Sequence, residues 1–230
     1  MQPLNVYMGY DSREDAAFRV ATASMFHNTK YHIDVCPLEL KWLRDRSLYW
    51  RENDPLASTE FAFSRFLVPY LNDYRGWAVF CDCDFLFRRD ISTILDYRDE
   101  TMGVLVVKHD YKPTETTKMD GRTQTQYPRK NWSSFMFINC GHEDVRRLTP
   151  EVVNRSSGQY LHRFQWLSEG AIGELPLEYN YLEGWNTKEQ CPDPIAVHFT
   201  RGGPWFDEYK NVEYADEWNK YASIAPRLAK

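Results

Sequence analysis

Short apolar runs alternate with segments of helical periodicity along most of this chain of 230 residues. Apolar runs of about 4–8 residues are typical of buried strands, whereas apolar side chains three or four positions apart are typical of helices. The predicted strands are residues 6–10, 33–36, 77–81, 102–107, 134–139 and 195–199. This alternation favours an α/β domain with a central, mostly parallel sheet flanked by helices.

Helical periodicity first appears directly after the first predicted strand. Asp11 and Glu14 have the spacing of a capping box, and Phe18 follows at a core-facing position. Further helices are predicted over residues 59–71, 90–97 and 213–225. Pro69 is expected to kink or end the helix that contains it, because proline cannot donate a backbone hydrogen bond.

The composition predicts a globular protein with a single domain over residues 1–230. Hydrophobic residues make up 43% of the chain and charged residues 27%, a balance typical of folded domains. A chain of this length fills one core well and is short for two. The net charge of −5 and the lack of a basic stripe argue against a nucleic-acid partner.

The sequence shows no pattern of a secretory leader and no apolar run of about 18 residues that could span a membrane. The five cysteines are odd in number, and their spacing matches no zinc-binding pattern. Reduced thiols in a cytoplasm are therefore expected.

A polar segment over residues 108–131 contains few apolar side chains. Loops of this length in compact domains usually serve a function or lack a fixed structure. Two interpretations are open: the segment is a flexible flap over a site, or it is a surface excursion without a role.

Acidic residues fall at or just after several predicted strand ends, namely Asp11, Asp82, Asp84 and Asp110. In open α/β sheets, ligands bind beyond the carboxyl ends of the strands. Asp82 and Asp84 follow the apolar strand 77–81 and are two positions apart, so in extended chain their side chains face the same way. Two carboxylates this close repel each other unless a cation lies between them, which predicts a Mg²⁺ or Mn²⁺ site.

A histidine at the end of the last predicted strand is the second chemical feature. His198 precedes the turn Thr-Arg-Gly-Gly over residues 200–203. Glycine allows backbone N–H groups to approach an anion closely, and Arg201 can donate charge-assisted hydrogen bonds to phosphate. An isolated histidine is more often structural, but beside the two acids His198 becomes a third metal ligand that favours Mn²⁺ over Mg²⁺.

Together these features resemble the GT-A nucleotide-sugar transferases, and most closely the family 8 type of glycogenin and the bacterial galactosyltransferases. The resemblance covers most of the chain in order. It includes the first strand, a helix with a donor-side arginine at Arg65, the Asp-x-Asp motif, a Leu-Pro segment that ends at Asn180, and the late histidine with its glycine turn. It implies a Rossmann-like GT-A fold and a metal-dependent hexosyltransferase that retains anomeric configuration.

The resemblance also implies roles for individual residues. The metal, Mn²⁺ or Mg²⁺, would be held by Asp82, Asp84 and His198. Among the catalytic residues, Asp110 and Gln165 would orient the transferred sugar, and Arg65 would act with the metal on the charge of the leaving diphosphate. The donor, a UDP-sugar, would contact Gly9, Tyr10, Asp11, Arg65, Asp82, Cys83, Arg201 and Gly202. The acceptor would be a sugar, a lipid or a protein.

Three departures from the family pattern leave alternatives open. Gly203 stands where the family has a lysine, Phe164 replaces an acid before Gln165, and residues 132–134 replace an Asn-x-Gly segment. These changes favour the alternative of a nucleotide-sugar-binding protein that is weakly active or inactive. An aspartate-dependent phosphohydrolase also carries Asp-x-Asp after a strand. Its motif, however, usually lies near the start of the chain and continues differently.

Overall fold

A central sheet organises the part of the chain that the computed structural model describes, which is residues 2–52, 57–110 and 129–225. The described residues form a six-stranded sheet in the order β2-β1-β3-β6-β5-β7. Its strands are β1 (Leu4–Gly9), β2 (Ile33–Leu38), β3 (Trp77–Cys81), β5 (Val104–Val106), β6 (Phe135–Asn139) and β7 (Ile172–Glu174). The predicted α/β class is confirmed.

The direction of the strands decides which residues meet at one edge. β1 is parallel to β2 and β3, and β5 is parallel to β7, whereas β6 runs antiparallel to both of its neighbours. The sheet is therefore mostly parallel, as predicted. Because β6 is reversed, its first residue, Phe135, pairs with Cys81, the last residue of β3. The chain entering β6 thus lies beside the acids that follow β3.

A second, three-stranded sheet among the described residues was not predicted. It consists of β4 (Phe85–Phe87), β9 (Ala196–His198) and β8 (Tyr181–Leu182), in the order β4-β9-β8. β4 follows the Asp-x-Asp motif and pairs antiparallel with β9, so that Phe85 lies opposite His198. The predicted strand at 195–199 therefore exists, but it belongs to this sheet rather than to the central one.

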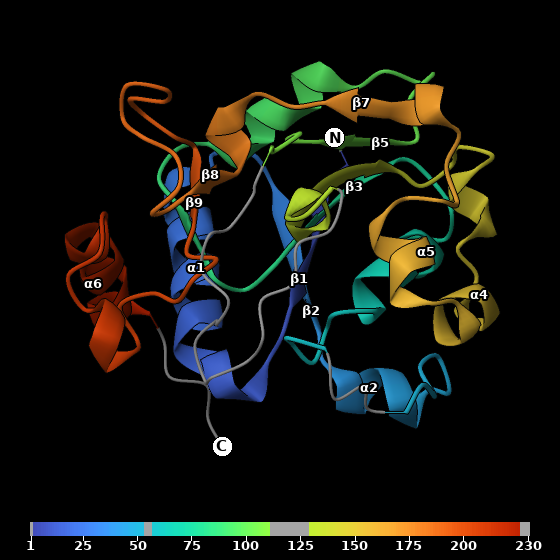
Figure 1. The fold of residues 1–230 in the computed structure, drawn as a ribbon, viewed down its shortest axis with the longest axis horizontal. Helices are drawn as coiled ribbons and strands as arrows, with labels where there is room; N and C mark the ends of the chain where they lie inside the picture. The colour runs from blue at the N-terminus through green and yellow to red at the C-terminus, as the bar shows by residue number, and fades with distance from the viewer. Residues whose placement is uncertain (1, 53–56, 111–128, 226–230) are drawn as a thin grey trace.

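Helices cover both faces of the central sheet (Figure 1). α1 and α6 lie on one side of β1 and β2, and α4 and α5 lie on the other. The α-helices of the described residues are α1 (Asp15–Asn28), α2 (Leu40–Asp45), α3 (Val68–Leu71), α4 (Pro150–Arg155), α5 (Gly158–His162) and α6 (Ala215–Ile224). The 3-10 helices are η1 (Ser12–Glu14), η2 (Ser64–Leu67), η3 (Ile91–Tyr97), η5 (Trp132–Ser134), η6 (Val145–Arg147), η7 (Glu169–Ala171), η8 (Leu177–Tyr179) and η9 (Asp207–Tyr209).

Two sequence predictions about helices need correction. The helix predicted over residues 59–71 consists of turns, the 3-10 helix η2 and only one α-helical turn, α3, where Pro69 occupies the second position. Proline is tolerated there because the N–H groups of a first turn have no partner within the helix. The predicted capping box also fails. Asp11 accepts from the Arg13 amide, but Glu14 turns away from the helix start and is buried.

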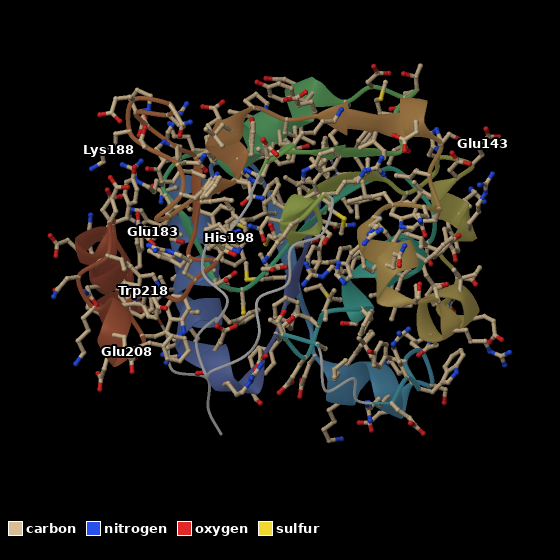
Figure 2. The ribbon with its side chains drawn as sticks, in the orientation of Figure 1. Glu143, Glu183, Lys188, His198, Glu208 and Trp218 are labelled. Carbon is tan, nitrogen blue, oxygen red and sulfur yellow. The ribbon has the colours of Figure 1, made fainter. Side chains whose placement is uncertain are left out.

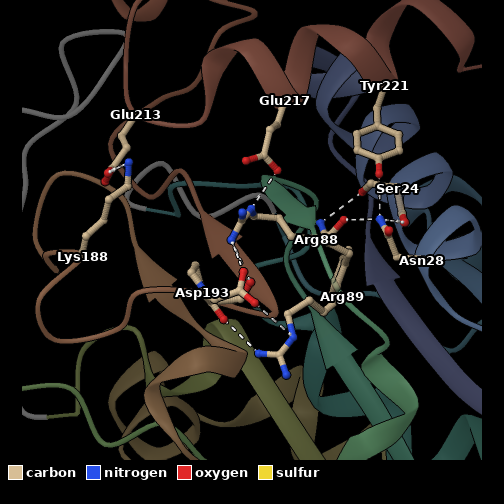
Figure 3. Close-up of polar contacts among 11 residues, drawn as sticks. Ser24, Asn28, Arg88, Arg89, Lys188, Asp193, Glu213, Glu217 and Tyr221 are labelled. Atoms are coloured by element: carbon tan, nitrogen blue, oxygen red, sulfur yellow. Dashed lines mark hydrogen bonds and ion pairs between the residues drawn. The ribbon is translucent and has the colours of Figure 1, made fainter.

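The C-terminal helix is fixed to the start of the chain by polar contacts (Figure 3). The Asn28 side-chain amide donates to the Tyr221 hydroxyl on α6 over 2.8 Å and to the carbonyl of Phe87 over 2.9 Å. Arg88, directly after β4, pairs with Glu217 on α6 over 2.8 Å and with Asp193 over 3.1 Å. α6, α1 and the second sheet, through its strand β4, are therefore held together by these contacts. The predicted C-terminal helix is confirmed.

Candidate active site

The two acids of the Asp-x-Asp motif are fixed by backbone bonds on both sides. All but the first residue of β3 are fully buried, so this strand must lie inside the sheet. The Asp82 amide continues the ladder and donates to the Ser134 carbonyl over 2.9 Å. The Asp84 carbonyl accepts from the Phe199 amide over 2.9 Å. Asp82 is thereby tied to the entry of β6, and Asp84 to the exit of β9.

His198 completes a group of three metal-ligand side chains. Its Nε2 lies 3.2 Å from Asp84 Oδ1, and its ring stacks on Phe85 with centroids 4.4 Å apart and planes 15° apart. One ligand atom from each of Asp82, Asp84 and His198 lies within 4.8 Å of the other two. Figure 2 shows His198 near the middle of the molecule, with Glu183 on its α6 side. The structure thus brings together the three residues predicted to hold a metal.

The chemistry of this donor set fits a divalent cation. Two carboxylate oxygens and one imidazole nitrogen converge, and carboxylates this close destabilise each other without a positive charge between them. Oxygen ligands suit both Mg²⁺ and Mn²⁺, and an imidazole ligand tilts the preference toward Mn²⁺. Asp82 and Asp84 would bind the ion through oxygen, and His198 through Nε2.

Arg65 supplies the first positive charge at the site. Its Nη1 lies 2.8 Å from Asp82 Oδ1 and donates to the Ser133 carbonyl over 2.7 Å. The guanidinium lies over the rings of Phe61 and Phe80, at 5.3 and 4.9 Å from their centroids, and Arg65 is buried. The positive charge of Arg65 therefore faces Asp82, one of the two acids proposed to bind the metal. The contact of Arg65 with the donor remains a prediction.

Glu14 is a third acid beside the site, and the sequence prediction missed it. Glu14 is 3% exposed, and its Oε2 lies 3.6 Å from Cys83 Sγ. Cys83 is the residue between Asp82 and Asp84 in the sequence. Burial, followed by the nearby charge of Asp84, raises the pKa of Glu14 to about 8. Because Glu14 follows Asp11 by three positions, the sequence predicted a capping residue, and its burial beside Cys83 is visible only in the folded structure. Cys83, a predicted donor contact, is fully buried against Glu14.

Glu14→Gln is expected to change how stability depends on pH. A carboxyl with a raised pKa in the folded protein binds its proton more tightly there than in the unfolded chain, so wild-type stability falls as pH rises from about 4.5 through about 8. Raising the pH from 5 to 8.5 should lower the unfolding free energy of the metal-free wild type more than that of the metal-free variant. The difference should be on the order of 3 kcal/mol. Urea unfolding in EDTA at both pH values measures this difference.

Glu151→Gln, which alters an exposed acid on α4, is the matched control and should follow the wild-type profile. Equal pH dependence in wild type and Glu14→Gln would contradict the assignment of a buried, neutral Glu14.

The glycine turn after β9 is closed in this structure. The Gly202 amide donates to the Phe199 carbonyl over 2.9 Å, and the Gly202 φ of +129° suits glycine. Arg201 Nη2 lies 3.3 Å from Glu183 Oε2, a buried carboxylate. Arg201 and Gly202 are therefore near the metal group in sequence and engaged by protein groups here. Their roles toward phosphate remain predictions.

The end of β1 supplies the residues predicted to seat a nucleoside. A Cβ at Gly9 would collide with the Phe61 ring, so only glycine fits there. Asp11 is fully buried and accepts from Arg13 side-chain and backbone N–H groups and from the Glu60 amide at 2.6–3.1 Å. Its carboxylate therefore holds the loop together, and its predicted contact with the donor remains a prediction.

A groove lies between α1 and the ends of β1 and β2. It has a volume of about 310 Å³ and is lined by Tyr10, Phe18, Thr22, Phe26, Val35, Pro37 and Glu39. Tyr10 meets Phe18 edge to face, with ring centroids 5.3 Å apart. Tyr10, which directly precedes Asp11, therefore lines a groove that is large enough for a small ring.

The predicted sugar contacts are less well placed. Asp110 is exposed, and most of the flap predicted over residues 108–131, namely 111–128, lies outside the described residues. Gln165 is exposed after α5. Both remain predictions. The neighbour of Asp110, His109, was missed: it is 9% exposed, and no described residue hydrogen-bonds its Nε2. Burial and nearby His198 lower the pKa of His109 to about 3.

Comparison with known proteins now places the chain in a family. No protein-family model matches it. Over 220 residues it is 50% identical to Protein CDI of Arabidopsis thaliana, a match that covers 94% of this chain and 85% of that protein. The chain belongs to the CDI family. The name of the relative states no activity, so the chemistry of this CDI-family chain has to be argued from its site.

Solved structures similar to the CDI-family chain are glycosyltransferases. The apo bifunctional glycosyltransferase WbbM has a TM-score of 0.67 at 15% identity, and 97% of this chain covers 50% of that chain. The glycosyltransferase GlyE of Streptococcus pneumoniae TIGR4 gives 0.62 at 12% identity, with 96% and 60% covered. The active-site mutant Q189E of LgtC gives 0.62 at 11% identity, with 99% and 98% covered.

At these identities the similarity establishes the fold alone. The CDI-family chain spans half of the WbbM chain and three-fifths of the GlyE chain, but nearly all of the LgtC chain. The GT-A fold predicted from the sequence is confirmed. The described residues also contain no helix that is long and apolar enough to cross a membrane.

Proposed function

We propose that this chain is a metal-dependent glycosyltransferase that transfers a sugar from a nucleotide-diphosphate donor, a UDP-sugar. The convergence of Asp82, Asp84 and His198 within 4.8 Å, beyond the carboxyl end of β3 in a GT-A fold, carries this proposal. The galactosyltransferase LgtC, whose structure was solved with donor and acceptor sugar analogs, shares the fold with a TM-score of 0.56. We take residues 1–230 as one catalytic domain.

Charge stabilisation of the leaving diphosphate is the central step of the proposed mechanism. Breaking the bond between sugar and phosphate builds negative charge on the phosphate oxygens. A bound Mn²⁺ or Mg²⁺ supplies Lewis-acid stabilisation of that charge. Arg201 would add a charge-assisted bond after release from Glu183, and Arg65, 2.8 Å from Asp82, would hold that carboxylate in place toward the ion.

Donor and acceptor would occupy the rim around the metal group. Gly9, Tyr10 and Asp11 would seat the nucleoside, with the Tyr10 groove beside it, and Asp110 and Gln165 would orient the transferred hexose. The transfer would retain the anomeric configuration, and the acceptor would be a sugar, a lipid or a protein.

Nucleotide binding tests the proposal without knowledge of the acceptor. UDP at 100 times its dissociation constant should stabilise the protein by about 2.7 kcal/mol when Mn²⁺ is present, because it binds only the folded state. For a chain of this size, that corresponds to a rise of about 5–10 °C in the melting temperature. A thermal-shift screen of UDP and UDP-sugars, with Mn²⁺ or with EDTA, measures it.

A CMP-sugar is the matched control, since it offers a nucleotide and a sugar but no diphosphate, and it should give a much smaller shift. If no nucleotide diphosphate raises the melting temperature, the proposed function is wrong. A Mn²⁺-dependent shift with UDP, but without transfer or hydrolysis of any UDP-sugar, would indicate the inactive binding protein. Turnover of an aryl phosphate that Asp82→Asn abolishes would indicate a phosphohydrolase.

A further inference from the structure

The second nitrogen of the His198 ring makes a buried hydrogen bond of its own. His198 Nδ1 lies 3.1 Å from Asn180 Oδ1, and Asn180 is fully buried. Asn180 ends the Leu-Pro segment of residues 175–180 and directly precedes β8, the strand that pairs with β9. The proposed function gives this residue no task, yet its side chain touches a proposed metal ligand on the side opposite the acids.

The direction of the Asn180 amide follows from its other partners. Asn180 Nδ2 donates to Ser134 Oγ over 3.0 Å and to the Asn131 carbonyl over 3.4 Å. The Ser134 hydroxyl hydrogen is itself donated to the Asn131 carbonyl over 2.6 Å, so the Ser134 oxygen can only accept from Asn180. The NH₂ group must therefore point at Ser134, and the amide oxygen must point at His198.

Asn131 can accept these bonds because of its backbone conformation. Its φ of 64° lies in the left-handed region, which asparagine tolerates better than most residues. Its carbonyl then accepts from the Ser134 hydroxyl and from the Asn180 amide. The amide of Asn180 is thus held at one end by His198 and at the other by Ser134, both of which are buried, and by the half-buried Asn131.

An amide oxygen can only accept, so the His198 proton belongs on Nδ1 when the imidazole is neutral. Nε2 then carries a lone pair, and it faces Asp84 Oδ1 at 3.2 Å. A lone pair and a carboxylate oxygen repel each other unless a cation lies between them. Stacking on Phe85 fixes the plane of the ring, and the bond to Asn180 fixes which edge faces the acids.

We propose that Asn180 is a positioning residue that sets the tautomer and the orientation of His198, so that Nε2 is presented to a divalent cation beside Asp82 and Asp84. This inference rests on the metal site of the proposed function. Partners of this kind on metal-bound histidines typically change metal affinity by about 10–100-fold when they are removed.

Direct Mn²⁺ binding tests the role of Asn180 without any activity assay. The electron paramagnetic resonance signal of free Mn²⁺ gives the dissociation constant of wild type, Asn180→Leu and Asn180→Asp. Leucine keeps the volume but cannot accept, so its dissociation constant should rise about 10–100-fold. Aspartate can still accept from Nδ1, and its second oxygen can accept the Ser134 hydroxyl hydrogen once that hydroxyl turns away from the Asn131 carbonyl, so its dissociation constant should stay well below that of Asn180→Leu.

The tautomer can be read from the wild-type protein alone, so the test survives if the variants do not fold. In wild-type protein labelled with ¹⁵N-histidine and saturated with diamagnetic Mg²⁺, two-dimensional NMR should show His198 with its proton on Nδ1, and the His198 signal is the one that trace Mn²⁺ broadens most. A proton on Nε2 would overturn the inference, as would equal Mn²⁺ affinity of wild type and Asn180→Leu. If wild type binds no Mn²⁺, the proposed function fails as well.

Discussion

Asp84→Asn should abolish measurable Mn²⁺ binding and lower UDP-sugar turnover by about 10²–10³-fold or more. Asp84 is the acid that links the metal group, because its Oδ1 faces His198 Nε2 at 3.2 Å. Asparagine keeps the shape of the side chain and leaves the backbone bond from Phe199 to residue 84 intact. The fold should therefore persist, and the loss reflects the missing charge against a leaving diphosphate.

The loss is measured as the rate of UDP-sugar hydrolysis at a Mn²⁺ concentration that saturates wild type, with the released UDP as the readout. Asp45→Asn on α2 is a suitable control, since Asp45 is exposed and pairs only with Lys41 among the described ion pairs. The control should retain full activity. Wild-type Mn²⁺ affinity in Asp84→Asn would show that the acids and His198 do not form a metal site.

Arg65→Met should destabilise the metal-free protein by about 3–5 kcal/mol. Removing one partner of a buried ion pair leaves the other charge uncompensated, and that cost is typically of this size. Here Asp82 would remain beside Asp84, and the Ser133 carbonyl would lose its donor. Methionine keeps most of the volume over Phe61 and Phe80, so the loss reports charge more than packing.

A double-mutant cycle with Asp82→Asn separates charge from packing. In the Asp82→Asn background, Arg65→Met should cost clearly less, because the negative charge that Arg65 faces is already absent. Urea unfolding in EDTA gives the four unfolding free energies. Costs that add within about 0.5 kcal/mol would contradict the coupling. Arg155→Met on the exposed face of α4 serves as the control and should cost less than about 1 kcal/mol.

Local sequence patterns were sufficient to predict five of the six strands of the central sheet, all but β7, and the acid pair of the metal group. β1, β3 and β6 consist mostly of buried apolar residues, a pattern that is typical of strands inside a sheet. The spacing of Asp82 and Asp84 predicted that they share a direction, and the late histidine was placed with them by resemblance. The fold then brings His198 to Asp84, although more than a hundred residues separate them.

Features that depend on long-range pairing could not be read from local patterns. β8 has only two residues, too few to show a period. β9 was predicted as a strand, but its pairing with β4 and β8 instead of the central sheet was not. The segment 59–71 has helical spacing, but tertiary contacts such as the Arg65 bonds hold most of it in tighter turns. Glu14 and Asn180 acquire their partners only in three dimensions.

The contact between α1 and α6 has a consequence for biosynthesis. Tyr221 and Asn28 are 193 positions apart, and β9 is likewise made long after β4. During translation, Asp82 and Asp84 therefore leave the ribosome well before His198. The second sheet can form only after β9 has been synthesised. Until then the acids lack their imidazole partner, so metal loading should follow translation rather than accompany it.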